Sequence, residues 1–109
     1  MKLIKAYIRT NMIDKVVHAL EEAGFTDMTL IDAKAIRRGI DPAQLDYSIE
    51  IAQRYMNVAK LEIVLDEKDE PRAKEIITKS ARTGRKGDGF IYTSPVDDAI
   101  HIRTGKLSS

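Results

Sequence analysis

The stretch LIKAYIRTNMIDKVVHALEEAG, residues 3–24, is the most informative about the fold because its apolar residues change from a strand period to a helix period. The first part, LIKAYIR, alternates between two faces, and one face carries Ile4, Ala6 and Ile8. The second part repeats apolar side chains at helical spacing, at Ile13, Val16, Val17 and Leu20. Asn11 is placed to cap the helix, and Gly24 is placed to end it. We therefore expect a strand followed directly by an amphipathic helix.

The rest of the chain continues this alternation of elements. MTLIDAKAI (28–36) and LEIVL (61–65) predict strands, and KDEPRAKEIITKSAR (68–82) predicts a second helix with Pro71 in its first turn. FIYT (90–93) and AIHIR (99–103) predict short final strands. The order is that of an α+β, ferredoxin-like βαββαβ fold in one domain, residues 1–109. Because two helices cover only one face of a four-stranded sheet, we expect the other face to drive self-association.

Composition excludes several classes of function. Lys and Arg number 18 against 17 Asp and Glu, so the net charge of +1 gives no general attraction to nucleic acid. There is no cysteine for thiolate chemistry, no apolar run as long as a membrane span, and no signal-peptide core in MKLIKAYIRT. We therefore expect a cytoplasmic protein. No nucleophile–base pair suggests an enzyme, and two histidines without cysteine do not suggest a metal site.

The segment RRGIDPAQLDYSIEIAQRYMN, residues 37–57, is too long for an ordinary hairpin connection. Asp41 could cap a short helix with Pro42 at its first position. We interpret the segment as a projecting loop with partial helix. The alternative is an extended hairpin that only lengthens the two flanking strands.

A basic, glycine-rich segment, ARTGRKGDGFIY (81–92), comes before the predicted strand at 90–93. Glycine allows positive φ, and successive exposed N–H groups can form a concave anion site. One hypothesis is therefore a phosphate cradle around Gly87 and Gly89. The alternative, given equal weight from spacing alone, is a helix C-cap at Gly84 followed by an ordinary turn.

A resemblance to a known family is carried by TGRKGDGFIYTSPVDDAIHIRTG (83–105), together with MKLIKAYIR, GFTDMTL and AKLEIVL. Over essentially its whole length the chain resembles the PII signal-transduction proteins. The resemblance implies a homotrimer that binds ATP or ADP in the clefts between subunits. It also implies that the long loop docks onto a target protein.

The resemblance also implies site residues. Those of the nucleotide site are Thr29, Ile36, Arg38, Glu62, Val64, Gly87, Asp88, Gly89 and Arg103. Those of the partner-docking loop are Arg37, Asp41, Tyr47, Glu50 and Arg54. A carboxylate is an awkward neighbour for phosphate, so we expect the Asp88 side chain to hold the loop through backbone hydrogen bonds.

Departures from the family pattern modify these expectations. Gly39 replaces a glutamine that helps to hold magnesium, Val58 replaces a lysine that pairs with 2-oxoglutarate, and Ile51 replaces a modified tyrosine. We therefore expect neither 2-oxoglutarate sensing nor the usual covalent switch, while nucleotide binding persists with reduced strength or changed preference. Similar divergent members are associated with transport or metal-efflux systems, which makes a membrane transporter a candidate target. The alternative is a CutA-like metal- or stress-tolerance trimer that binds no nucleotide.

Overall fold

The computed structural model describes residues 1–36 and 55–108. Its elements are β1 (Lys2–Arg9), a 3-10 turn η1 (Thr10–Met12), α1 (Ile13–Glu22), β2 (Thr29–Ile36), β3 (Tyr55–Leu65), a 3-10 turn η3 (Glu67–Asp69), α3 (Glu70–Ala81) and β4 (Gly89–Pro95). Residues 37–54 lie outside this description, and with them the predictions for Arg37, Arg38, Asp41, Tyr47, Glu50 and Arg54.

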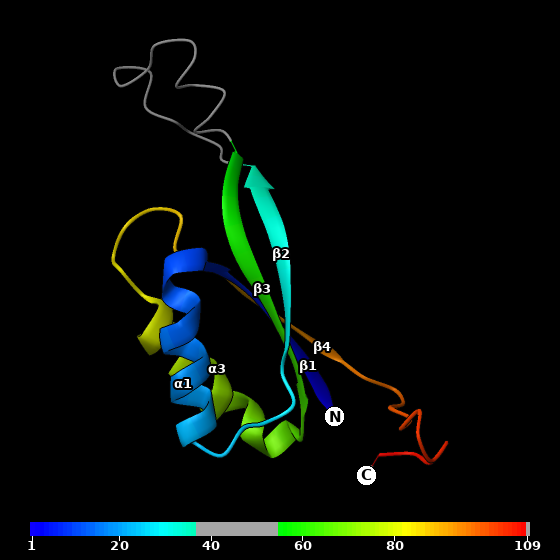
Figure 1. The fold of residues 1–109 in the computed structure, drawn as a ribbon. Coiled ribbons are helices and arrows are strands. Elements are labelled where there is room, and N and C mark those ends of the chain that lie inside the picture. The colour runs from blue at the N-terminus through cyan, green and yellow to red at the C-terminus, as the bar shows by residue number, and fades with distance from the viewer. Residues whose placement is uncertain (37–54, 109) are drawn as a thin grey trace, which may run out of the picture.

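The predicted ferredoxin-like fold is confirmed. The four strands form one antiparallel sheet in the order β2-β3-β1-β4, and α1 and α3 both pack on one face of it (Figure 1). β3 begins at Tyr55, which pairs with Ile36, so residues 55–57 are strand and not loop. The projecting-loop interpretation places these residues in the loop, whereas the extended-hairpin alternative allows a longer strand; continued pairing with β2 satisfies the backbone groups of residues 55–57.

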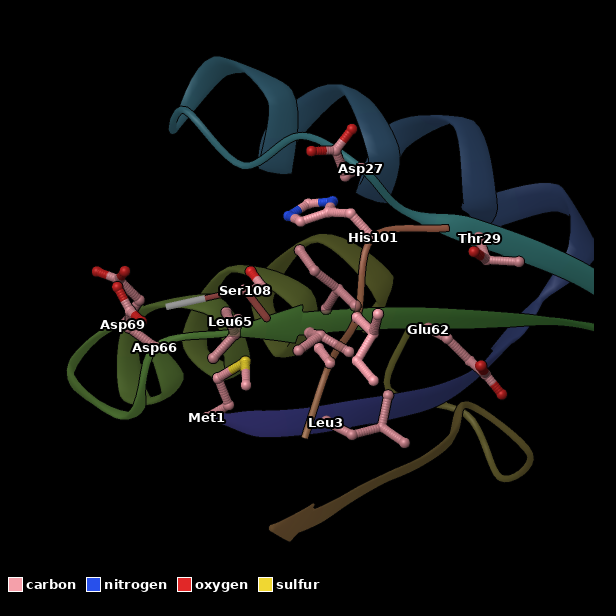
Figure 2. A pocket seen from close by; sticks show the side chains of 14 residues that line it. Met1, Leu3, Asp27, Thr29, Glu62, Leu65, Asp66, Asp69, His101 and Ser108 are labelled. Atoms are coloured by element: carbon pink, nitrogen blue, oxygen red, sulfur yellow. The ribbon is translucent and has the colours of Figure 1, made fainter. Parts of the chain in front are cut away.

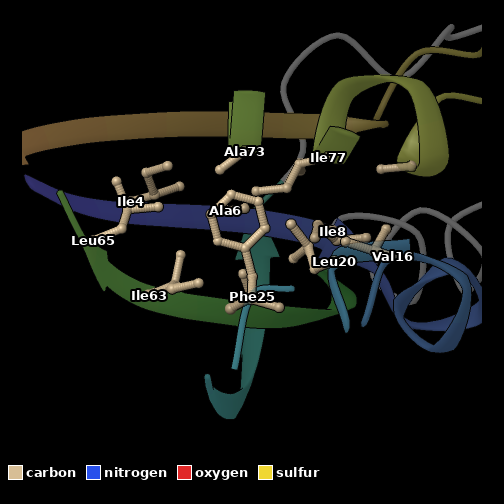
Figure 3. Close-up of a cluster of buried hydrophobic side chains, with 12 residues drawn as sticks. Ile4, Ala6, Ile8, Val16, Leu20, Phe25, Ile63, Leu65, Ala73 and Ile77 are labelled. Atoms are coloured by element: carbon tan, nitrogen blue, oxygen red, sulfur yellow. The ribbon is translucent and has the colours of Figure 1, made fainter. Parts of the chain in front are cut away.

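The core lies between the helices and the sheet (Figure 3). Ile4, Ala6 and Ile8 are buried on β1, as their alternation predicted, and their partners Ile63 and Leu61 are buried on β3. The helices contribute Val16, Leu20, Ala73 and Ile77 to the same cluster. Burial of these side chains at about 25 cal/mol per Å² of apolar surface is the main force that holds the helices to the sheet.

The end of α1 is set by Gly24, as expected. Gly24 has a φ of +92°, and the N–H of Phe25 donates to the carbonyl of Leu20 at 3.0 Å, as in a Schellman motif. The predicted cap by Asn11 is wrong. Thr10–Met12 form a 3-10 turn, so the residue that precedes the α-helix is Met12, which makes no side-chain capping hydrogen bond.

The C-terminal part of the chain also differs from prediction. Residues 99–103 form no strand; a single bridge joins Ile100 to Leu107, with a turn between them. The pairing of β4 with β1 ends at Pro95 and Lys2, and the Val96 N–H donates to the Met1 carbonyl at 3.2 Å. The segment 99–103 lies beyond this pairing.

The sheet face opposite the helices carries exposed apolar and aromatic side chains. Val64 is 47% exposed, Phe90 70% and Tyr92 55%. Tyr92 packs edge-on to Tyr7 with ring centroids 5.9 Å apart, and it stacks on Phe90 at 6.1 Å. We call this surface, made of Leu3, Tyr7, Ile31, Val64, Phe90 and Tyr92, the open face.

Candidate functional site

The glycine-rich loop, residues 82–88, connects α3 to β4 beside the end of β1 (Figure 1). α3 ends at Ala81 and is followed by Arg82 in an extended conformation, so Gly84 does not cap the helix. Gly84 and Gly87 have φ values of +84° and +91°, which only glycine adopts readily. Gly89 has a different constraint, because a Cβ there would lie 1.7 Å from the carbonyl oxygen of Tyr7. Gly89 is therefore required by the packing of β4 against β1.

The carboxylate of Asp88 holds this loop together. Its Oδ2 accepts hydrogen bonds from the N–H groups of Thr83 and Gly84, both at 3.0 Å. Its Oδ1 accepts from the Thr83 hydroxyl and from Nε of Arg9, the latter at 3.1 Å. The hydrogen bond from the Thr83 hydroxyl, with others from Thr83 N–H, Arg9 and Gly84, holds the pKa of Asp88 well below its usual value. The expected role of Asp88 in shaping the loop is confirmed.

A second feature is a pocket of about 470 Å³ at the opposite end of the strands (Figure 2). Its floor is formed by β1 and β3, and the segment 99–101 closes one side. It brings together three of the predicted nucleotide-site residues, Thr29, Glu62 and Val64. The Glu62 carboxylate is held by Lys60 at 3.0 Å.

The charge of this pocket is mostly negative. Asp66 and Asp69 lie at one end of the pocket and Glu62 at the other, while His101 and Asp27 face its rim (Figure 2). Four carboxylates and one histidine favour hydrogen-bond donors and disfavour phosphate. Within the described residues, no group of three His, Asp or Glu side chains is arranged to hold a metal ion.

Within one chain, the pocket and the glycine-rich loop do not form a single site. The register places Val64 beside Leu3 and Glu62 beside Lys5, whereas Gly89 lies beside Ile8 at the other end of β1. Three to five residues of strand separate these levels, or about 10–16 Å at the usual rise. Ile36 is exposed at the far end of β2, and Arg103 is exposed in the turn that follows the pocket-lining His101.

The profile of the family described as nitrogen regulatory protein P-II matches residues 1–106. This chain belongs to the P-II family. Three similar proteins are each named nitrogen regulatory protein P-II. That of Bradyrhizobium diazoefficiens is 38% identical, that of Azospirillum brasilense 36% and that of Synechocystis 35%. Each comparison covers 97% of this chain and 95% of the relative.

Membership in the P-II family makes this chain a regulatory signalling protein by descent. The described part of this P-II chain contains no helix long and apolar enough to cross a bilayer.

Two residues that hold the glycine-rich loop of this P-II chain, Arg9 and Thr83, were not identified from the sequence. Arg9 lies at the end of β1, 79 positions from Asp88, and no local pattern signals that contact. Thr83 was a detectable candidate, because Thr, Ser and Asp near a turn commonly hydrogen-bond local backbone groups. Its hydroxyl accepts the Arg85 N–H at 3.2 Å and donates to Asp88.

Proposed function

We propose that this P-II chain assembles as a homotrimer, binds ATP or ADP between subunits and regulates a partner protein through residues 37–54. The observation that carries the proposal is the preformed glycine-rich loop around Asp88, together with a pocket that holds Thr29, Glu62 and Val64. The adenosine part of the ligand occupies the pocket, and the phosphates lie on the N–H groups near Gly87 and Gly89.

The separation of the two features supports a site shared by two subunits. About 10–16 Å of strand length lies between their levels, and they are on β2–β3 and β4, at opposite sides of the sheet. We therefore place the nucleotide between the pocket of one subunit and the loop of the next. In this proposal Arg103 and Ile36 complete the site across the subunit interface.

Charge supports the same arrangement of the ligand. The pocket carries carboxylates at Asp27, Glu62, Asp66 and Asp69, so it suits the uncharged base and sugar but not phosphate. The loop carries cations at Arg82, Arg85 and Lys86, and its glycines let the backbone approach a ligand closely. The acidic end of one subunit and the basic loop of the next are also complementary to each other.

The open face supports the trimer. It exposes Phe90, Tyr92 and Val64 together, whereas the opposite face is covered by α1 and α3. A contiguous exposed apolar patch of this kind marks an association surface. Ile102, fully exposed in the C-terminal segment, adds to the apolar surface that an assembly would cover.

We propose that 2-oxoglutarate is not an effector. Val58, in place of the lysine expected from the family pattern, is 4% exposed in the sheet, where it pairs with Ala33 and Arg9. An apolar side chain cannot compensate a dicarboxylate. Gly39, which would weaken magnesium binding, lies outside the described residues.

The proposed regulation acts in the cytoplasm on a partner that the loop contacts, with a membrane transporter or efflux system as the candidate class. The loop residues of this proposal are Arg37, Asp41, Tyr47, Glu50 and Arg54, with Arg38 linking the loop to the nucleotide. Membership in the P-II family supports this hypothesis over a CutA-like protein without nucleotide binding.

Calorimetric titration with ATP, ADP, AMP and 2-oxoglutarate tests the proposal. We expect saturable binding of ATP or ADP at one site per chain, and no heat from 2-oxoglutarate with or without ATP. Sedimentation equilibrium on the same sample should give a trimer at micromolar concentration. A stable monomer, or an absence of adenine nucleotide binding, would contradict the proposal.

A further inference from the structure

Arg9 makes two contacts with the glycine-rich loop from the end of β1. Its Nε donates to Asp88 Oδ1 at 3.1 Å, and its Nη2 donates to the backbone carbonyl of Lys86 at 2.6 Å. The Arg9 and Asp88 side chains are only 18% and 24% exposed. One guanidinium therefore joins two points of the loop to the sheet, which the planar fork of arginine does and an ammonium does not.

The contact with Lys86 has a consequence for the next residue. In a planar trans peptide, the carbonyl and the following N–H point in opposite directions. Because Arg9 holds the Lys86 carbonyl, the Gly87 N–H is turned away from Arg9. Gly87 is one of the residues proposed to meet the phosphates, so the direction of this donor depends on Arg9.

The contact with Asp88 has a separate, electrostatic consequence. Asp88 carries a negative charge next to the proposed phosphate position, and this charge would repel a nucleotide. Arg9 compensates it, while the hydrogen bonds from Thr83 and Gly84 use the remaining capacity of the carboxylate. Without Arg9, the Asp88 carboxylate would remain in the loop without the cation that compensates its charge.

We infer that Arg9 is a positioning residue for the phosphate-binding loop: it aims the Gly87 N–H at the ligand and neutralises Asp88 without itself contacting the nucleotide. This inference rests on the proposed nucleotide-binding function. It concerns the phosphate end of the ligand only, because the pocket around Thr29 and Glu62 is at the other end of the strands.

The test is titration of Arg9→Met with ADP and with adenosine, which lacks phosphate. We expect the ADP affinity to fall about tenfold, because the variant loses two partly exposed, charge-assisted hydrogen bonds that hold the loop. The adenosine affinity should stay unchanged, because adenosine has no phosphate to contact the loop. Lys15→Met, on an exposed position of α1, removes the same charge elsewhere and should leave both affinities unchanged. Arg9→Lys keeps the charge but cannot span both contacts, and should give an intermediate ADP affinity.

A double-mutant cycle with Asp88→Asn tests whether Arg9 acts by neutralising Asp88. We expect Arg9→Met to cost less ADP affinity in the Asp88→Asn background than in the unmodified protein. Equal costs in the two backgrounds would overturn the neutralisation of Asp88 by Arg9, and equal losses for ADP and adenosine would overturn the whole role of Arg9, while the proposed function stands in both cases. If the unmodified protein binds neither ADP nor ATP, the proposed function fails, and the role of Arg9 fails with it.

Discussion

Gly89→Ala is the sharpest test of the loop geometry. The new methyl group would lie 1.7 Å from the Tyr7 carbonyl oxygen and 2.9 Å from its carbonyl carbon. Ordinary contact requires β4 to move from β1 by more than about 1 Å at this point, which breaks the backbone pairing of Gly89 with Ile8. Because Gly89 is the first residue of β4, the damage can stay local to that end of the strand.

The expected cost of Gly89→Ala has two parts. A φ of +110° is unfavourable for alanine by about 1 kcal/mol, and the loss of one or two strand hydrogen bonds adds about 1 kcal/mol each. We therefore expect the free energy of unfolding to fall by about 3 kcal/mol, a large part of the roughly 5–15 kcal/mol typical of a domain.

Gly84→Ala is the matched control for this prediction. Gly84 has a φ of +84°, but a Cβ there would meet no atom within 4 Å, so only the backbone cost of about 1 kcal/mol remains. Both variants are compared by urea denaturation at one fixed protein concentration, because association would shift apparent stability. Equal losses for Gly84→Ala and Gly89→Ala would refute the close approach of Gly89 to Tyr7.

Three further predictions follow from the same structure. Folding lowers the pKa of Asp88, so its ionised carboxylate stabilises the native state at pH values above the unfolded pKa of about 4. This contribution is lost as the pH falls below that value. Acid titration followed by circular dichroism should therefore show a smaller loss of stability from pH 5 to pH 2 in Asp88→Asn than in the unmodified protein. Phe90→Asp, which puts a charge on the open face, should shift the sedimentation equilibrium mass from trimer to monomer, whereas Glu21→Lys on α1 should not. Leu20→Ala removes a fully buried side chain and should lower the free energy of unfolding by about 3 kcal/mol in denaturant titration, and a loss under about 1 kcal/mol would contradict its place in the core.

The sequence predicted those elements whose signals are local. The alternation of Ile4, Ala6 and Ile8, and the helical spacing of Val16 and Leu20, identified buried faces that the structure confirms. Gly24 and Pro71 marked a helix end and a helix start correctly, because φ preferences act on single residues. Thr29, Glu62 and Val64, assigned through the family resemblance, do lie together in one pocket, although their role in binding stays a prediction.

Features that depend on contacts between distant residues were decided by the tertiary structure alone. The AIHIR segment has the composition of a strand, but among the described residues its strand-like pairing is the isolated bridge of Ile100 to Leu107. Gly89 was interpreted as a phosphate-loop glycine, and only the pairing of β4 with β1 shows that Tyr7 leaves no room for a side chain. The contact of Arg9 with Asp88 spans 79 positions and exists because β1 is the central neighbour of β4. Periodicity and turn preferences are properties of neighbouring residues. Strand order, by contrast, brings together residues that are far apart in the chain, and no local pattern predicts their contacts.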